Sequence, residues 1–296
     1  MEIPKEEIIP IMENKNNLNN YKSHKIRLFH YAPWNIVETI ITNGYMKATL
    51  PSECNDILEH IGACTSKKDF AVQRELQKIN TVGMLCFSRT SKSSTMWGHY
   101  ADHHRGAVLV FEMDVIKAQY EMTQDILCFV IKDRLKNDSN LIKNIIHVVN
   151  YSEIRPSLIF HGNGKSLFET SDSQIKRFTN KGNDWEYEQE MRIFLDLKNP
   201  DFIYGGKYFY NHLLSYLKEI VIGVNHEYGI EYVKTFIKKH RKSKSIKISS
   251  SYFNHISYTT ETEVADSPSL ETMKEWTPEI ILYETHPSLS YRNINL

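Results

Sequence analysis

The chain has 296 residues, of which 41% are hydrophobic and 24% charged, so it can form one large or two small globular domains. Lysine plus arginine and aspartate plus glutamate both number 36, and this zero formal charge excludes a general nucleic-acid or membrane-surface binder. No apolar run approaches a membrane span, the first residues do not resemble a signal peptide, and the four cysteines form no CxxC pair. We therefore expect a reduced, cytoplasmic protein.

The predicted elements are short strands separated by helices. In the first half, strands are expected at 27–31, 82–88 and 106–113, and helices at 33–43, 69–77 and 91–101. In the second half, strands are expected at 146–151, around 186–194, at 219–223 and at 246–253, with a helix at 229–241. This order favours the α+β class. The expected organisation is a flexible extension at 1–23, a domain at 24–253 with a helical insertion at about 114–180, and a tail at 254–296.

The densest charge lies in the run from Trp185 to Phe194, which contains Glu186, Glu188 and Glu190. On a strand these three carboxylates and Arg192 share one face, because the side-chain period is two. Carboxylates this close repel each other, which can raise the pKa of one of them. The spacing alone favours a solvated charged edge. The alternative is a site for a positive centre: a metal, an arginine, or the cationic sugar of a glycosyl-transfer transition state.

Two other stretches could contact a ligand. His30 ends the first predicted strand, beside Tyr31, where it can hydrogen-bond a ligand across the sheet edge or pack in the core. After Ser88, a hydroxyl-rich turn leads into a helix that carries Trp97 and Tyr100. Hydroxyl and N–H groups at a helix start suit phosphate or ribose oxygens, and the two aromatics could stack a flat heterocycle or belong to the core.

Metal-ligand spacing occurs twice, both times incompletely. His99 and His103 stand four residues apart with Asp102 nearby, but the HExxH pattern is absent. Cys54, His60 and Cys64 have no fourth ligand at a suitable spacing. We therefore expect no metal site.

Together these stretches resemble the motifs of the ADP-ribosyltransferase superfamily, especially its His-Tyr-Glu branch. Leu28-Phe29-His30 with Asn43-Gly44 resembles the first motif, Phe87 to Ser94 the second, and Glu188-Gln189-Glu190 the third. A narrower resemblance, over about residues 26–250, is to a widespread bacterial family of unassigned function. It rests on Asn55-Asp56, on Met96 to Asp102 with His104 and Gly106, and on Trp185 with Glu188, Glu190 and Arg192.

The superfamily resemblance implies a split β-sheet core that binds NAD as a substrate. It implies that His30 holds the nicotinamide ribose, that Ser88 supports the pocket, and that Trp97 or Tyr100 covers the nicotinamide. Glu190 then stabilises the oxocarbenium-like transition state, and Glu188 positions or deprotonates the acceptor. Tyr31 and Arg192 complete the implied NAD-binding residues.

The implied activity is that of an ADP-ribosyltransferase or NAD glycohydrolase, with a protein, a nucleic acid or water as acceptor. The bacterial family context suggests a toxin or defence effector. One alternative is a non-catalytic module of the same fold that senses a nucleotide or binds a protein. Another is a metal-dependent hydrolase that uses His99, Asp102, His103 and the glutamates.

Overall fold

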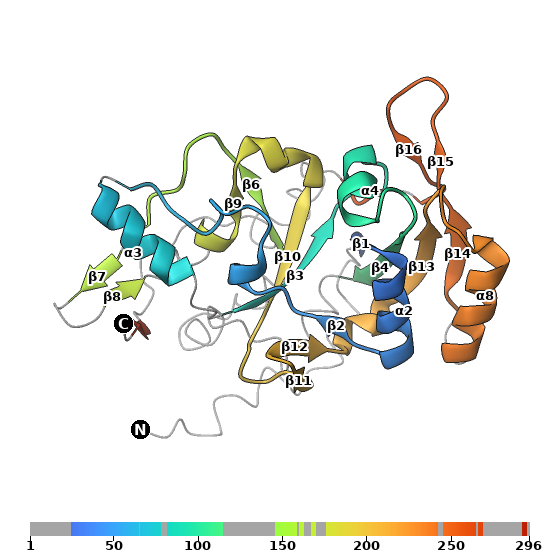
Figure 1. The fold of residues 1–296 in the computed structure, drawn as a ribbon, viewed down its shortest axis with the longest axis horizontal. Helices are drawn as coiled ribbons and strands as arrows, with labels where there is room; N and C mark the ends of the chain where they lie inside the picture. Colours follow the sequence, from blue (N-terminus) through green and yellow to red (C-terminus); the bar gives the residue numbers. More distant parts are fainter. Residues whose placement is uncertain are drawn as a thin grey trace, which may run out of the picture.

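The computed structural model describes residues 25–64, 66–77, 82–114, 146–158, 160–162, 167–169, 176–241, 245–264, 266–268 and 292–294. These residues form an α+β fold, as expected, around a seven-stranded sheet in the order β14-β13-β4-β1-β3-β10-β5 (Figure 1). The strands are β1 (Lys25–Ala32), β3 (Gly83–Ser88), β4 (Ala107–Asp114), β5 (Ile146–Val148), β10 (Glu190–Leu195), β13 (Leu217–Ile222) and β14 (Lys247–Ser250). Within this sheet, β13 and β14 pair in parallel and the other neighbouring strands pair antiparallel.

The sheet has a weak seam between β1 and β3. β1 pairs with β4 along its whole length, from Lys25↔Asp114 to Ala32↔Ala107. β3 pairs with β10 from Gly83 to Ser88. β1 and β3 are joined in register only at Phe29↔Ser88. Two well-paired groups of strands therefore meet at a single residue pair.

Helices cover the two faces of the sheet differently. α2 (Trp34–Asn43) and α8 (Gly229–His240) lie side by side on one face, where Val37, Ile41 and Val233 are buried against the strands (Figure 1). α4 (Ser94–Tyr100) covers part of the other face with Met96 and Trp97. The alternation of side chains along β1 explains this division. Leu28 and Ala32 face α2 and α8, whereas Phe29 and Tyr31 face α4.

Local signals place the ends of these helices. Pro33 precedes α2, and Gly44 ends it in the left-handed region with φ 83°. The Ser93 side chain accepts a hydrogen bond from the Met96 N–H and so caps α4. The observed helix α4 is therefore shorter than the helix predicted at 91–101. Ser93 fixes its start, and a left-handed turn at Asp102 to His104 follows its end.

Smaller elements surround the sheet. They are β2 (Met46–Lys47) with β11 (Phe202–Tyr204) and β12 (Lys207–Tyr210); β6 (Asn150–Tyr151) with β9 (Asn180–Lys181); β15 (Tyr252–Phe253) with β16 (Thr260–Glu261); and β7 (Phe160–Gly162) with β8 (Leu167–Glu169) and β17 (Arg292–Ile294). Helix α3 (Lys67–Gln77) and the 3-10 helices η3 (Pro51–Glu53), η4 (Asn183–Glu188) and η5 (His212–Tyr216) complete the described elements. No helix among these residues is long and apolar enough to cross a membrane.

The structure divides two predicted strands and leaves other predictions untested. The strand expected at 146–151 becomes β5 and β6, and the one at 246–253 becomes β14 and β15. The extension at 1–23 and residues 115–145 of the expected helical insertion lie outside the described residues, as does most of the tail. The first part of that tail packs on the domain, because the Thr90 hydroxyl donates to Asp266 and the Ser267 N–H donates to the Arg89 carbonyl.

Candidate functional site

Five charged residues from separate parts of the chain meet on the α4 side of the sheet. They are Glu59 after η3, Lys181 on β9, Glu188 at the end of η4, and Glu190 and Arg192 on β10. Each is at most 9% exposed. Glu190 and Arg192 share a face of β10 because they are two residues apart. The expectation of a solvated charged edge is therefore wrong, since these charges are buried and paired.

Arg192 holds the inner part of this charged cluster together. Its Nε and Nη2 donate to Oε1 and Oε2 of Glu190, both at 2.7 Å, which is a bidentate pair. Nη2 also donates to Glu59, and Nη1 donates to the Phe178 carbonyl at 2.7 Å. Arg192 is 1% exposed, so these acceptors replace the water it would otherwise bind.

Lys181 connects the inner pair to Glu188. Its Nζ lies 2.6 Å from Oε2 of Glu188 and 3.5 Å from an oxygen of both Glu59 and Glu190. It also lies 4.7 Å from the centre of the Trp185 ring, a cation–π distance. Burial alone lowers the pKa of Lys181, but the three carboxylates outweigh it and raise the pKa. Lys181 is therefore a permanent cation here.

Glu188 occupies the outer end of the cluster, beside α4. The Tyr100 hydroxyl donates to its Oε1 at 2.5 Å and accepts a hydrogen bond from the Asn55 side chain at 3.2 Å. Tyr100 is half-buried. Glu188 is thus held between the buried Lys181 and the half-buried Tyr100.

The pKa values of Glu188 on η4 and Glu190 on β10 shift in opposite directions. Burial raises the pKa of Glu188, and Glu190 raises it further against the opposing effect of Lys181. Burial also acts to raise the pKa of Glu190, but Arg192 and Lys181 outweigh it and lower that pKa to about 2. Glu190 is thus fixed as an anion, whereas Glu188 is the carboxylate that takes up a proton more readily.

The three glutamates of the run do not share a strand face, which corrects the expectation from spacing. Residues 183–188 form the 3-10 helix η4, Gln189 adopts the left-handed conformation with φ 44°, and the strand starts at Glu190. Glu186 is exposed on this turn. Lys181, and not a common strand face, brings Glu188 and Glu190 together.

His30 lies on the opposite face of the sheet from Glu190. Glu190 is in register with Ser88, and Ser88 with Phe29, so these three share the α4 face. His30 points the other way, where its ring contacts Phe87, and its Nδ1 lies 3.1 Å from the Cys86 carbonyl oxygen. The expectation that His30 and Glu190 line one hollow is therefore wrong, because neighbouring residues of a strand face opposite sides.

The other predicted binding residues lie on the α4 face, mostly in the core. Trp97 has no exposed surface, donates from Nε1 to the Ser91 carbonyl at 2.8 Å and packs edge-on against Tyr31. The Tyr31 hydroxyl donates to the Thr90 carbonyl, and the Ser88 hydroxyl accepts from the Thr90 N–H. Trp97 is thus a core aromatic, and of the two candidate stacking residues only Tyr100 reaches the charged cluster.

His99 and His103, whose sequence spacing is that of metal ligands on a helix, do not form a helical pair. The helix ends at Tyr100, and Asp102, His103 and His104 all have positive φ, so His99 and His103 do not stand one helical turn apart. Asp102 is exposed and pairs with Arg105, and His99 lies 3.1 Å from the Tyr187 hydroxyl. This geometry removes the basis for a metal-dependent hydrolase that uses these residues.

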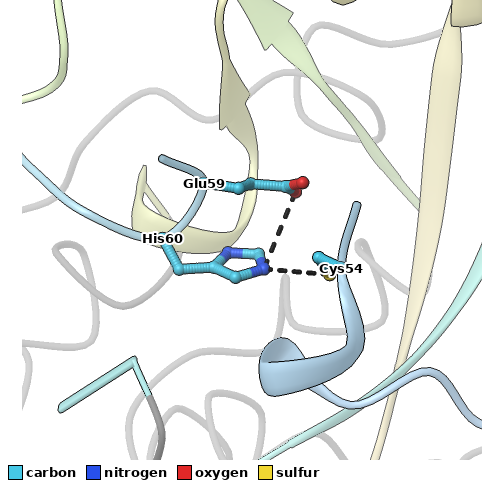
Figure 2. A group of neighbouring side chains, drawn as sticks. All are labelled: Cys54, Glu59 and His60. Carbon is cyan, nitrogen blue, oxygen red and sulfur yellow. Dashed lines mark hydrogen bonds and ion pairs between the residues drawn. The ribbon is translucent and has the colours of Figure 1, made fainter. Parts of the chain in front are cut away.

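A different set of potential metal ligands adjoins the charged cluster. Cys54, Glu59 and His60 form the one group of three or more such side chains within the described part of the chain (Figure 2). Cys64 is not part of this group, and its thiol donates to the Gly62 carbonyl. Burial lowers the pKa of His60 to about 4, so the ring is neutral, and burial raises the pKa of Cys54 to about 12.

The sequence comparison places most of the cluster inside one matched region. Residues 96–193 match the sequence model of a family described as a protein of unknown function (DUF2971). This range contains Tyr100, Lys181, Glu188, Glu190 and Arg192, and it agrees with the resemblance to a family of unassigned function. Neither the curated proteins nor the solved structures gave a match.

Sequence reasoning missed Lys181 and gave Glu59 no role. Lys181 follows a polar stretch with no periodic signal, and its backbone is placed by the short parallel pairing of β9 with β6. Glu59 lies 133 positions from its partner Arg192. The run Asn55-Asp56 pointed to this loop, as did the incomplete metal-ligand spacing of Cys54 and His60, and Asn55 contacts Tyr100.

Proposed function

We propose that this chain uses NAD as a substrate and breaks its bond to nicotinamide, as an ADP-ribosyltransferase or an NAD glycohydrolase. The observation that carries the proposal is the convergence of three carboxylates, Glu59, Glu188 and Glu190, which share their closest printed ion pairs with Lys181 and Arg192 among the residues that the structure describes. Preorganised negative charge stabilises a cationic oxocarbenium-like transition state.

The order of strands also supports the proposal. The three strands that carry the motif-like residues are neighbours in the sheet, in the order β1-β3-β10. The single joint at Phe29↔Ser88 supports the finer expectation of a split sheet core. Ser88 connects β1 to β10, because it is in register with Phe29 on one side and with Glu190 on the other.

The residue roles in this proposal differ from those that the resemblance implies. Glu190 is engaged by two donors of Arg192, so it shapes the local potential and does not bind the ribose itself. Glu188 takes the catalytic role: a ribose hydroxyl replaces the Tyr100 hydroxyl at Oε1, and the carboxylate then faces the developing positive charge. Tyr100, once displaced, covers the nicotinamide. The acceptor is water, a protein or a nucleic acid.

Substitution of Glu188 tests this assignment. We expect Glu188→Gln to abolish nicotinamide release from NAD by the full chain, a loss of at least about 100-fold, as for removal of one preorganised charge-stabilising group. Glu186→Gln is the matched control, because Glu186 is exposed two residues away. Circular dichroism confirms that both variants are folded. Unchanged turnover in folded Glu188→Gln would refute the catalytic role.

One observation favours a second candidate, a non-catalytic module that senses a nucleotide. Every carboxylate of the cluster already accepts hydrogen bonds from a cation within the protein, as a purely structural network would. Calorimetry with NAD beside the turnover assay distinguishes the two. Binding without nicotinamide release supports the sensor, and release that depends on Glu188 supports the enzyme.

A further inference from the structure

Cys54, Glu59 and His60 direct one donor atom each toward a common point beside the charged cluster (Figure 2). The Cys54 sulfur, a Glu59 carboxylate oxygen and a His60 nitrogen all lie within 4.8 Å of one another. His60 Nε2 is 3.3 Å from Cys54 Sγ and 3.7 Å from Glu59 Oε1. Ligand atoms of a tetrahedral zinc ion are about 3.3–3.6 Å apart, given bond lengths of about 2.0–2.3 Å.

We propose that these three side chains form a zinc site, with the Cys54 thiolate, His60 Nε2 and the Glu59 carboxylate as ligands. A thiolate and an imidazole together favour zinc over magnesium or calcium, which prefer oxygen ligands. Three protein ligands leave the fourth position of the tetrahedron to water. The site is separate from the contact between Glu188 and Tyr100, and the inference does not depend on NAD chemistry.

The surroundings of His60 match those of a metal-bound histidine. Its Nδ1 lies 3.3 Å from the Arg177 carbonyl oxygen, to which it donates, so Nε2 carries the lone pair that faces Cys54 and Glu59. A second hydrogen bond of this kind orients metal-binding histidines. His60 also adopts the left-handed backbone conformation, with φ 64°, a strained geometry that concentrates at functional positions.

Glu59 already has cationic partners at the proposed site. Its Oε1 accepts from Arg192, and its Oε2 lies 3.5 Å from Lys181. A carboxylate offers about four lone-pair sites, so an ion bound at Oε1, which is 3.7 Å from His60 Nε2, adds a contact to those that Glu59 already makes. Arg192 and Lys181 repel a further cation, as does Arg177 near His60. Ionisation of Cys54 supplies the compensating negative charge.

The binding step is balanced without any redox partner. The S–H bond of Cys54 breaks, its proton goes to solvent, and a sulfur–zinc bond forms. His60 is already neutral and loses no proton. No electron is transferred.

Cobalt spectroscopy of the full chain tests the site. After removal of metal with a chelator, the protein is titrated with Co²⁺, whose bond to a thiolate gives a near-ultraviolet charge-transfer absorption. We expect one Co²⁺ per chain, an absorption that Zn²⁺ abolishes by competition, and loss of that absorption in Cys54→Ser. Cys64→Ser is the matched control, since that thiol lies outside the group, and it should retain the absorption.

The outcomes separate a true site from adventitious binding. Absence of stoichiometric metal in the folded wild-type chain, or persistence of the absorption in Cys54→Ser, overturns the proposal. If Cys54→Ser does not fold, His60→Asn gives a second measurement, because asparagine tolerates positive φ. It should weaken binding by more than the roughly 10–100-fold that loss of an outer hydrogen-bond partner costs, and an unchanged affinity overturns the proposal.

Discussion

Glu190→Gln should destabilise the chain severely, even though the substitution changes the volume of the side chain very little. Glutamine cannot neutralise Arg192, which is 1% exposed and receives two hydrogen-bond acceptors from Glu190. Removal of one partner of a buried ion pair costs about 3–5 kcal/mol. Glu59 and the Phe178 carbonyl still engage Arg192, so we expect the lower end, about 3 kcal/mol.

Urea denaturation followed by circular dichroism measures this loss. We expect a lower midpoint with an unchanged slope, because the surface exposed on unfolding is the same. Glu186→Gln, on the exposed turn before the strand, should stay within about 0.5 kcal/mol of wild type. A loss below about 1 kcal/mol in Glu190→Gln would refute the conclusion that Glu190 neutralises Arg192.

Three further substitutions test other parts of the structure. Burial gives His60 a pKa of about 4 against an ordinary 6.5, so the unfolded state binds more protons between these values. The unfolding free energy should therefore fall by about 3 kcal/mol as the pH drops from 6.5 to 4, and His60→Asn should flatten that dependence in pH-resolved denaturation. Gly223→Ala should cost at least about 3 kcal/mol, because its Cβ would lie 1.9 Å from the His104 carbonyl oxygen. Gly98→Ala should instead stabilise by about 0.5–1 kcal/mol, because its Cβ meets nothing within 4 Å and alanine favours a helix; equal thermal shifts in the two glycine variants would contradict this.

The elements with strong local signals could be predicted from the sequence. The apolar spacing from Ile36 to Ile41, with Gly44 behind it, gave α2 with nearly its observed ends. The apolar runs at 82–88 and 106–113 became β3 and β4. The hairpin of β11 and β12 was not predicted, because its exposed residues Phe202, Ile203 and Tyr204 show no alternation of apolar and polar side chains.

The charged run shows where local reasoning fails. Spacing by two predicted one strand face, but a 3-10 turn and the left-handed Gln189 interrupt the pattern. The superfamily resemblance implied that His30 and Glu190 contact the same NAD molecule. The register, which depends on long-range pairing through Ser88, turns them to opposite faces.

The amino-acid sequence by itself determined the α+β class and the approximate positions of the strands of the seven-stranded sheet and of its helices, and it singled out Glu188, Glu190, Arg192 and Tyr100 as candidates. Periodicity and capping are local properties, so they can be read along the chain. Only the tertiary structure decided which charges meet, since Lys181 and Glu59 reach the cluster through strand pairing and loop packing across many residues. Burial then decided their state: without water, each carboxylate must find a cation, and these pairings appear only once the chain has folded.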